Sequence, residues 1–391
     1  MSRRPARVIG VLTTGRSDYG LLRPVVAALR ARPGVRVLLF VSGMHLSARF
    51  GRTVREVVAD GHADDVVRVP ALAPGDDPAA VARSIGQATV RFARALATHR
   101  PDVFVVLGDR FEVLGAAVAT LPFNIPLAHI HGGEVTEGAV DDATRHALTK
   151  MSHLHFVATR EYAARVRQMG EESWRITVSG APGLDALRGF VPTPADRLAA
   201  RVGIPVGPAT LLVTYHPETR RGERGTLVDL DTLLGELARV PGPVLFTAPN
   251  ADTGRDAVAG RIAAFVAAAP ARRALVANLG HQDYLSAMAH VGAMVGNSSS
   301  GLIEAPSFRL PVVNVGDRQR GRVRARNVID VPARAAAIRR GIRTALDPAF
   351  RRSLRRLANP YGRGAAGAAI ARVLAATPLD QRLLVKRFVD L

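Results

Sequence analysis

The sequence predicts an α/β protein made of two Rossmann-like domains, each with a parallel sheet covered by helices. Uninterrupted apolar runs such as residues 102–107 and 125–130 suit strands that are buried on both faces of a parallel sheet. The Ala-rich residues 111–121 between these runs are typical of a crossover helix. The same alternation restarts after residues 188–194, where two prolines and a glycine mark a linker.

In the first domain the chain opens as strand, helix and strand, and the alternation continues from there. We expect its strands over residues 7–12, 35–41, 66–69, 102–107, 125–130, 155–158 and 176–179. We expect its helices over residues 21–30, 50–60, 78–98, 111–121, 142–152 and 161–169.

In the second domain the same pattern predicts strands with helical segments between them. These strands are expected over residues 210–214, 244–247, 274–276, 293–295 and 312–315. The predicted domains are therefore residues 1–187 and 188–365, and residues 366–391 form a helical tail that could pack back on the first domain. Open parallel sheets bind ligands at their carboxyl edges, so we expect the ligand in an interdomain cleft.

Composition excludes several classes of protein. The chain has 391 residues and a formal charge of +20, but this charge is spread along the sequence and consists almost wholly of arginine, which argues against nucleic acid as a partner. Cysteine is absent, which excludes disulfides and thiolate sites, and no HExxH spacing indicates a metal. No apolar run is long enough to span a membrane and the start lacks a signal peptide, so we expect a cytoplasmic protein without membrane contact.

The most informative stretch lies between residues 108 and 150. Asp109 and Arg110 follow one predicted strand, and His131 and Glu134 follow the next. A further group, Asp141, Asp142, Arg145 and His146, opens the helix after them. Carboxylates, imidazoles and guanidinium groups therefore gather at one carboxyl edge, where an α/β protein builds an active site.

The second domain carries a candidate phosphate site. Ser298 and Ser299 follow a strand and lead into a helix, where hydroxyls and backbone amides suit an anion; the alternative is an ordinary serine-capped helix. Arg318, in the basic loop 316–322, could bind a diphosphate or remain solvated. Glu304 could face a ribose hydroxyl or merely favour the helix dipole. His216 ends the first strand of this domain and could titrate near neutrality.

In order along residues 6 to 370, the motifs closely resemble those of the UDP-N-acetylglucosamine 2-epimerases, particularly the hydrolysing branch that serves sialic and legionaminic acid pathways. The motifs that carry the resemblance are Gly15-Arg16-Ser17-Asp18-Tyr19-Gly20, Ser42-Gly43-Met44-His45-Leu46-Ser47, Gly108-Asp109-Arg110, His129-Ile130-His131-Gly132-Gly133-Glu134, Asp141-Asp142, Arg145-His146, His216-Pro217, Gly296-Asn297-Ser298-Ser299 and Gly316-Asp317-Arg318-Gln319.

The resemblance implies a glycosyltransferase-B-type fold with a UDP-sugar in the cleft, no cofactor or metal, and a homodimer or homotetramer. It implies acid/base roles for Asp109, Asp141, His131, Glu134 and His216. The residues implied to bind substrate include a diphosphate set (Arg16, Arg110, Ser298, Ser299 and Arg318), Glu304 for the ribose and Tyr284 near the uracil, with Asp18, His45, Arg145 and Asn297 beside them.

Two departures from the family pattern affect these roles. Many relatives carry a catalytic glutamate where this chain has His131, so either His131 performs that proton transfer or Glu134 or Asp141 replaces it. A lysine that some relatives carry after the first loop is Leu21 here, which removes one possible phosphate contact.

The implied reaction begins with loss of UDP, because the C2 proton of a 2-acetamido sugar is acidic only once C1 gains cationic character. A base then takes the C2 proton to give a glycal, and a second group returns a proton to the opposite face. Water adds at C1 in the hydrolysing branch, which the motif wording favours; UDP adds back in the non-hydrolysing alternative. A retaining glycosyltransferase and a catalytically silent UDP-sugar-binding protein are further alternatives. UDP-GlcNAc and a 2,4-diacetamido-6-deoxy analogue both remain open as substrates.

Overall fold

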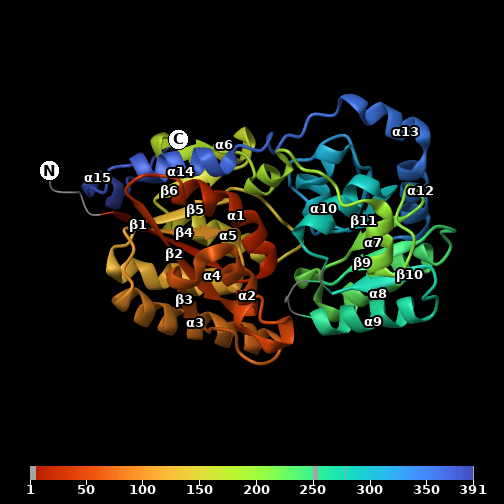
Figure 1. The fold of residues 1–391 in the computed structure, drawn as a ribbon, viewed down its shortest axis with the longest axis horizontal. Helices are drawn as coiled ribbons and strands as arrows, with labels where there is room; N and C mark the ends of the chain where they lie inside the picture. Colours follow the sequence, from red (N-terminus) through yellow and green to blue (C-terminus); the bar gives the residue numbers. More distant parts are fainter. Residues whose placement is uncertain (1–5, 250–253, 278, 391) are drawn as a thin grey trace. The chain divides into compact units, whose positions relative to one another are not determined.

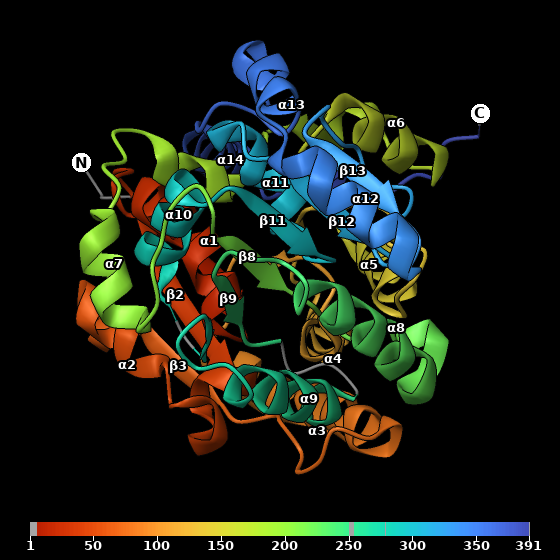
Figure 2. The ribbon, with the colours of Figure 1, turned by 90° about the vertical axis from the view of Figure 1, so that its right-hand side faces the viewer.

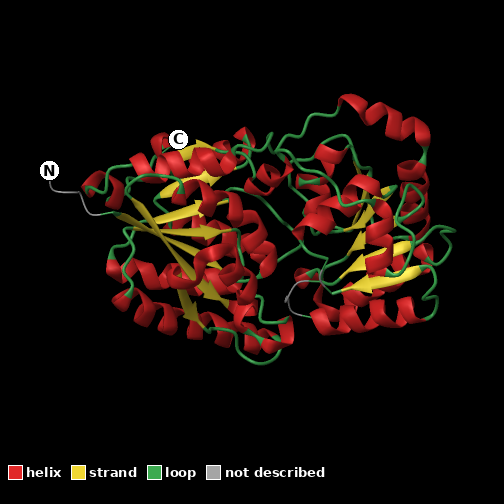
Figure 3. Ribbon diagram, viewed as in Figure 1, coloured by secondary structure: helices red, strands yellow, loops and turns green. Residues whose placement is uncertain are grey.

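The computed structural model describes residues 6–249, 254–277 and 279–390, and these form two compact units. Unit 1 comprises the chain up to Glu134, Asp141–Arg188 and the chain from Tyr361 onward, and unit 2 comprises Val135–Val140 and Gly189–Pro360. Each unit is a parallel α/β sheet with helices on it (Figure 3). The predicted fold class of two Rossmann-like halves is therefore confirmed. The unit bounds differ from the predicted domain ranges at residues 135–140, 188 and 361–365.

Unit 1 is built on a seven-stranded sheet in the order β3-β2-β1-β4-β5-β6-β7. All neighbouring strands pair in parallel. The strands are β1 (Arg7–Thr13), β2 (Val35–Ser42), β3 (Val66–Val69), β4 (Val103–Leu107), β5 (Leu127–Ile130), β6 (Leu154–Val157) and β7 (Ile176–Val178). In the register of β4 with β5, Leu107 lies beside Ile130, so the loops that begin at Gly108 and His131 leave the sheet side by side.

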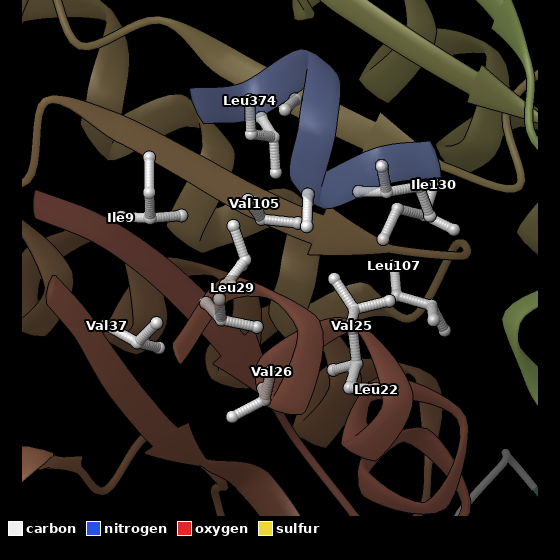
Figure 4. Packing of buried hydrophobic residues seen from close by; sticks show 14 of the residues in the cluster. Ile9, Leu22, Val25, Val26, Leu29, Val37, Val105, Leu107, Ile130 and Leu374 are labelled. Atoms are coloured by element: carbon white, nitrogen blue, oxygen red, sulfur yellow. The ribbon is translucent and has the colours of Figure 1, made fainter. Parts of the chain in front are cut away.

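Helices cover both faces of this sheet. They are α1 (Arg16–Arg30), α2 (Val54–Val57), α3 (Pro78–Thr98), α4 (Phe111–Thr120), α5 (Asp141–Met151), α6 (Arg160–Gln168), α14 (Ala366–Ala376) and α15 (Gln381–Leu384). Although far apart in sequence, α1 and α14 lie side by side (Figure 1). Figure 4 shows Leu374 of α14 and Leu22 of α1 gathered over the strands that carry Ile9 and Val105. Burial of such side chains is the main stabilising term on this face.

Unit 2 is built on a six-stranded parallel sheet in the order β10-β9-β8-β11-β12-β13. Its strands are β8 (Leu211–Thr214), β9 (Val244–Thr247), β10 (Arg273–Val276), β11 (Ala293–Gly296), β12 (Val312–Val315) and β13 (Val328–Val331). Its helices are α7 (Ala195–Val202), α8 (Gly222–Leu237), α9 (Arg255–Ala267), α10 (His281–His290), α11 (Ser300–Ile303), α12 (Ala335–Leu346) and α13 (Pro348–Ser353). Figure 2 shows α8, α9 and α12 on one side of the strands and α7 and α10 on the other.

Two secondary-structure expectations are corrected by the structure. The helix predicted over residues 50–60 is confirmed only in part, because α2 begins at Val54, has four residues and passes into a single wide turn that breaks at Gly61, where φ is +81°. The strand β13 was not expected, although Val328–Val331 pairs with β12 along its whole length. Its central Asp330 interrupts the apolar run by which the other strands were recognised. Within the described residues, no helix combines the length and apolar character needed to cross a membrane.

Candidate functional site

Asp109 and Arg145 form an ion pair at the carboxyl edge of the unit 1 sheet. Asp109 follows β4, and its carboxylate accepts a hydrogen bond from Nη2 of Arg145, which is carried by α5. The Arg145 side chain is only 2% exposed, whereas that of Asp109 is 20% exposed. A buried guanidinium therefore holds a carboxylate that keeps part of its surface available.

His131 and Glu134 form a second pair at the end of β5. Nδ1 of His131 lies 2.6 Å from Oε1 of Glu134, and both side chains are almost wholly buried. The His131 backbone has φ of +68°, in the left-handed region that residues with side chains rarely adopt. Its N–H donates to the carbonyl of Phe156 in the neighbouring strand at 3.0 Å, which fixes the turn against the sheet.

His129 supports the loops of both pairs, and the sequence reasoning did not select it as a site residue. Its Nε2 donates to the carbonyl of Gly108 at 2.7 Å, directly before Asp109. Burial lowers the pKa of His129 to about 3, so the ring is neutral at physiological pH. Gly132 passes so close to this ring that a Cβ there would meet Nδ1 at 3.0 Å.

Arg110 also has a buried carboxylate partner that the motifs did not reveal. Its Nη2 donates to Oε1 of Glu112 at 3.1 Å, and Glu112 is completely buried at the start of α4. Burial raises the pKa of Glu112, and the Arg110 charge opposes this shift. Glu112 therefore anchors the guanidinium to which a phosphate-binding role was assigned.

The segments that follow β1 and β2 of unit 1 carry three of the sequence-predicted binding residues. Arg16 pairs with Glu56 at 3.0 Å, and the carboxylate of Asp18 accepts a hydrogen bond from Thr14. His45 has no exposed surface, and its ring nitrogens lie 2.9 Å from Oγ1 of Thr13 and 2.8 Å from Oγ1 of Thr53. Burial lowers the pKa of His45 to about 4. In this structure His45 is a packed core residue.

In unit 2, Asn297 holds His216 in place. The side-chain Oδ1 of Asn297 accepts from the His216 N–H at 2.7 Å, and its Nδ2 donates to the His216 carbonyl at 2.9 Å. Asn297 is fully buried, so its side chain is used on the protein itself. The preceding Gly296 has φ of +133°, and a Cβ there would meet the Thr214 carbonyl at 2.0 Å, so only glycine fits.

The carbonyl of Asn297 also gathers the basic loop. It accepts hydrogen bonds from Nη1 of Arg318 at 3.2 Å and from Nε2 of Gln319 at 2.8 Å. Tyr284, on α10, places its phenol against the hydroxyls of Ser300, Thr214 and Ser298, and burial raises its pKa. Ser298, Arg318 and Tyr284 thus lie around one strand end, whereas Ser299 and Glu304 flank the short α11.

A buried acid that sequence reasoning missed lies next to this loop. Glu218 is 1% exposed, and a Cβ on Gly316 would meet its Oε1 at 2.1 Å. Burial and the nearby Asp229 raise the pKa of Glu218, so it favours the neutral form. Its position two residues after His216 was the only signal in the sequence.

Asp141 lies at the start of α5, directly after the segment Val135–Val140. Within unit 2, this segment is tied to the basic loop by an ion pair between Glu137 and Arg320 at 3.0 Å. Among the described residues no group of three or more histidine or acidic side chains is arranged to hold a metal ion.

The fold and these strand-end groups define a glycosyltransferase-B-type protein with acid/base residues in one Rossmann-like half and small polar and basic residues in the other. The sequence model described as UDP-N-acetylglucosamine 2-epimerase matches residues 27–375, and the chain belongs to this family. It is 35% identical to UDP-N,N'-diacetylbacillosamine 2-epimerase (hydrolyzing) of Legionella pneumophila, over 97% of this chain and 98% of the relative. It is 34% identical to GDP/UDP-N,N'-diacetylbacillosamine 2-epimerase (hydrolyzing) of Campylobacter jejuni, over 83% of this chain and 84% of the relative.

Among solved structures, the fold matches UDP-GlcNAc 2-epimerase from Neisseria meningitidis bound to UDP-GlcNAc. The TM-score is 0.78, with 19% identity, and the match covers 95% of this chain and 100% of the other. The resemblance inferred from the motifs is therefore confirmed at the level of family and fold.

Proposed function

We propose that this protein is a hydrolysing 2-epimerase that acts on a UDP-linked 2-acetamido sugar and releases UDP and the free 2-epimeric sugar. The observation that carries the proposal is the group of ionisable side chains at the ends of β4 and β5, where Asp109 and His131 keep accessible surface while their partners are buried. The names of the two relatives support hydrolysis and favour a 2,4-diacetamido sugar as substrate.

Each unit has its own task in this proposal. Asp109, His131 and Asp141 of unit 1, with His216 of unit 2, form the set from which the two proton-transfer groups at C2 are drawn. Ser298, Ser299 and Arg318 of unit 2 bind the diphosphate, with Glu304 for the ribose and Tyr284 for the base. Positive charge and hydroxyl groups fixed in advance stabilise the departing diphosphate, which is usually the largest catalytic contribution.

The reaction balances without a cofactor. The C1–O bond breaks and its electron pair leaves with UDP, while a base takes the C2 proton and the C2–H electron pair forms the C1=C2 bond. An acid on the other face then delivers a proton to C2, and water adds its oxygen to C1. The sum is UDP-sugar plus water giving UDP plus the free 2-epimer.

The test is incubation of the full chain in heavy water with UDP-GlcNAc or with UDP-N,N'-diacetylbacillosamine, followed by proton NMR. Free sugar of inverted C2 configuration, one deuterium at C2 and free UDP are expected. Asp109→Asn should lower kcat by about 100-fold, whereas Asp64→Asn, at an exposed position, should not change it. Accumulation of the epimer still attached to UDP would establish the non-hydrolysing reaction, and absence of deuterium at C2 would overturn the proposal.

A further inference from the structure

We propose that Nε2 of His131 is the base that takes the C2 proton and that Glu134 is a positioning residue, which fixes the ring through Nδ1. This inference rests on the proposed function. It assigns a role to the histidine at position 131, where many members of the family carry a glutamate. Its basis is the geometry of the pair at the end of β5.

The hydrogen bond between the two side chains determines which ring nitrogen is available. A carboxylate can only accept, so at 2.6 Å from Oε1 of Glu134 the proton lies on Nδ1 of His131. The neutral ring then carries its lone pair on Nε2. Among the described residues, His131 has no hydrogen-bond partner for Nε2, and its side chain keeps 9% of its surface exposed. The ring nitrogen without a partner is therefore a proton acceptor.

Glu134 is placed to act through the ring rather than on a ligand. Its side chain is 1% exposed, so the carboxylate faces the protein interior. When Nε2 takes the C2 proton, the C2–H electron pair forms the C1=C2 bond and the ring becomes an imidazolium. The buried carboxylate beside Nδ1 then stabilises this charge, as the aspartate of a Ser-His-Asp catalytic triad stabilises the imidazolium of its histidine.

The backbone supports a functional position for His131. Within the described part of the chain, four residues with side chains have positive φ, and three of them, Arg52, Asn124 and Arg309, are exposed. His131 is the buried one, with φ of +68°. Strain of this kind is concentrated at functional sites, because the surrounding structure must hold it. Here the neighbouring strand and the close approach of Gly132 to His129 do so.

Several charged and titratable groups surround the pair. His129 of the same strand and His155 of β6 are buried, with their pKa values lowered. Arg165 of α6 donates to the carbonyl of Gly133, and the Asp109–Arg145 pair lies on the adjacent loop. His129 and His155 are both wholly buried, so Glu134 is the ionisable side chain in direct contact with the His131 ring.

The test measures Glu134→Gln and His131→Gln in the full chain, with exposed Glu161→Gln and His99→Gln as matched controls. Glutamine keeps the shape of Glu134 but removes its charge, and its amide can donate to Nδ1 as well as accept from it, so the preference for the Nδ1–H tautomer is lost. We expect kcat to fall about 100-fold, KM to change less than about 3-fold, and the acid limb of the kcat profile to move to lower pH. His131→Gln should abolish deuterium entry at C2 and still bind UDP by calorimetry.

Nitrogen-15 NMR of the histidine rings provides a readout that does not depend on turnover. It should show the Nδ1–H tautomer of His131 in the wild type and its loss in Glu134→Gln. This inference would be overturned if Glu134→Gln kept the wild-type pH profile of kcat, or if His131→Gln still exchanged deuterium at C2. Either result would leave the proposed function standing. Failure of the wild type to epimerise any UDP-2-acetamido sugar would instead overturn the proposed function, and this inference with it.

Discussion

Removal of the charge of Glu171 is predicted to destabilise unit 1 strongly. It follows α6, its side chain has no exposed surface, and it accepts hydrogen bonds from Nε2 of His155 at 3.0 Å and from Nζ of Lys150 at 2.7 Å. Nζ of Lys386, in the C-terminal segment, lies 2.9 Å away. Burial alone would raise the pKa of Glu171, but these three donors together lower it to about 2.

The expected loss follows from this shift. Lowering the pKa from its ordinary value of 4.5 to about 2 corresponds to roughly 3 kcal/mol at about 1.4 kcal/mol per pH unit. Glu171→Gln imitates the protonated carboxyl, so it should lower the free energy of unfolding of unit 1 by about 3 kcal/mol at pH 7. A group with a lowered folded pKa stabilises above its unfolded pKa, so the difference from wild type should shrink to about 1 kcal/mol as the pH falls to 3.

The single tryptophan provides the assay. Trp174 lies in unit 1 beside the guanidinium groups of Arg175 and Arg382, which are 4.2 and 4.7 Å from its ring centroid. Urea unfolding followed by its fluorescence therefore reports on this unit and on the tail. Exposed Glu161→Gln is the control, expected to cost less than about 1 kcal/mol. A Glu171→Gln difference below 0.5 kcal/mol, or one that does not shrink in acid, would refute the reasoning.

Three further predictions concern buried backbone and ring contacts. Asn297→Ala should destabilise unit 2 by about 3 kcal/mol and weaken UDP binding in calorimetry, because two backbone groups of His216 lose their partner; Asn297→Asp should recover part of the loss. Gly296→Ala should cost at least about 3 kcal/mol in thermal unfolding, since its Cβ would lie 2.0 Å from the Thr214 carbonyl. His129, with its pKa lowered to about 3, should make unit 1 about 2 kcal/mol less stable at pH 5 than at pH 7, and His129→Gln should lack this part of the dependence.

Both His129 and Glu171 make unit 1 less stable in acid, but for different reasons. Glu171 loses a favourable charge when it is protonated, whereas His129 gains a charge that burial disfavours. A buried neutral imidazole binds its proton in the unfolded chain first, so stability is complete above the unfolded pKa near 6.5 and falls as the pH is lowered. The change in the urea midpoint between pH 7 and pH 5 measures this loss of stability. The same change in wild type and in His129→Gln would contradict the prediction.

Strands and long helices were predictable because burial on both faces leaves uninterrupted apolar runs. Residues 66–69, 78–98 and 312–315 match β3, α3 and β12 residue for residue. The failures have local causes. The pattern over residues 50–60 resembles a helix, but the helical segment begins only at Val54 and breaks at Gly61, where φ is +81°. The tail forms helices as expected, but its contacts with Glu171 and Arg175 were not predictable, because they join residues more than 200 positions apart in the sequence.

The candidate site residues could be selected from sequence motifs, whereas the buried residues that hold them in place could not. Asp109, Arg110 and Arg145 were selected by type and position, yet Arg145 is used on Asp109 and Arg110 is anchored by Glu112. Sequence spacing does not tell whether an arginine faces a ligand or a buried carboxylate, because that depends on which side of the strand end each loop turns.

The supporting residues share one physical property, which explains why they escaped the motif search. Glu112, His129 and Glu218 are each at least 99% buried, and burial moves each of them toward its neutral form. His129 and Glu112 hold the strand-end loops through hydrogen bonds, and Glu218 packs closely against Gly316. A search for such sites should therefore look for ionisable residues within two positions of a strand-end motif, where the strand places them under the loop.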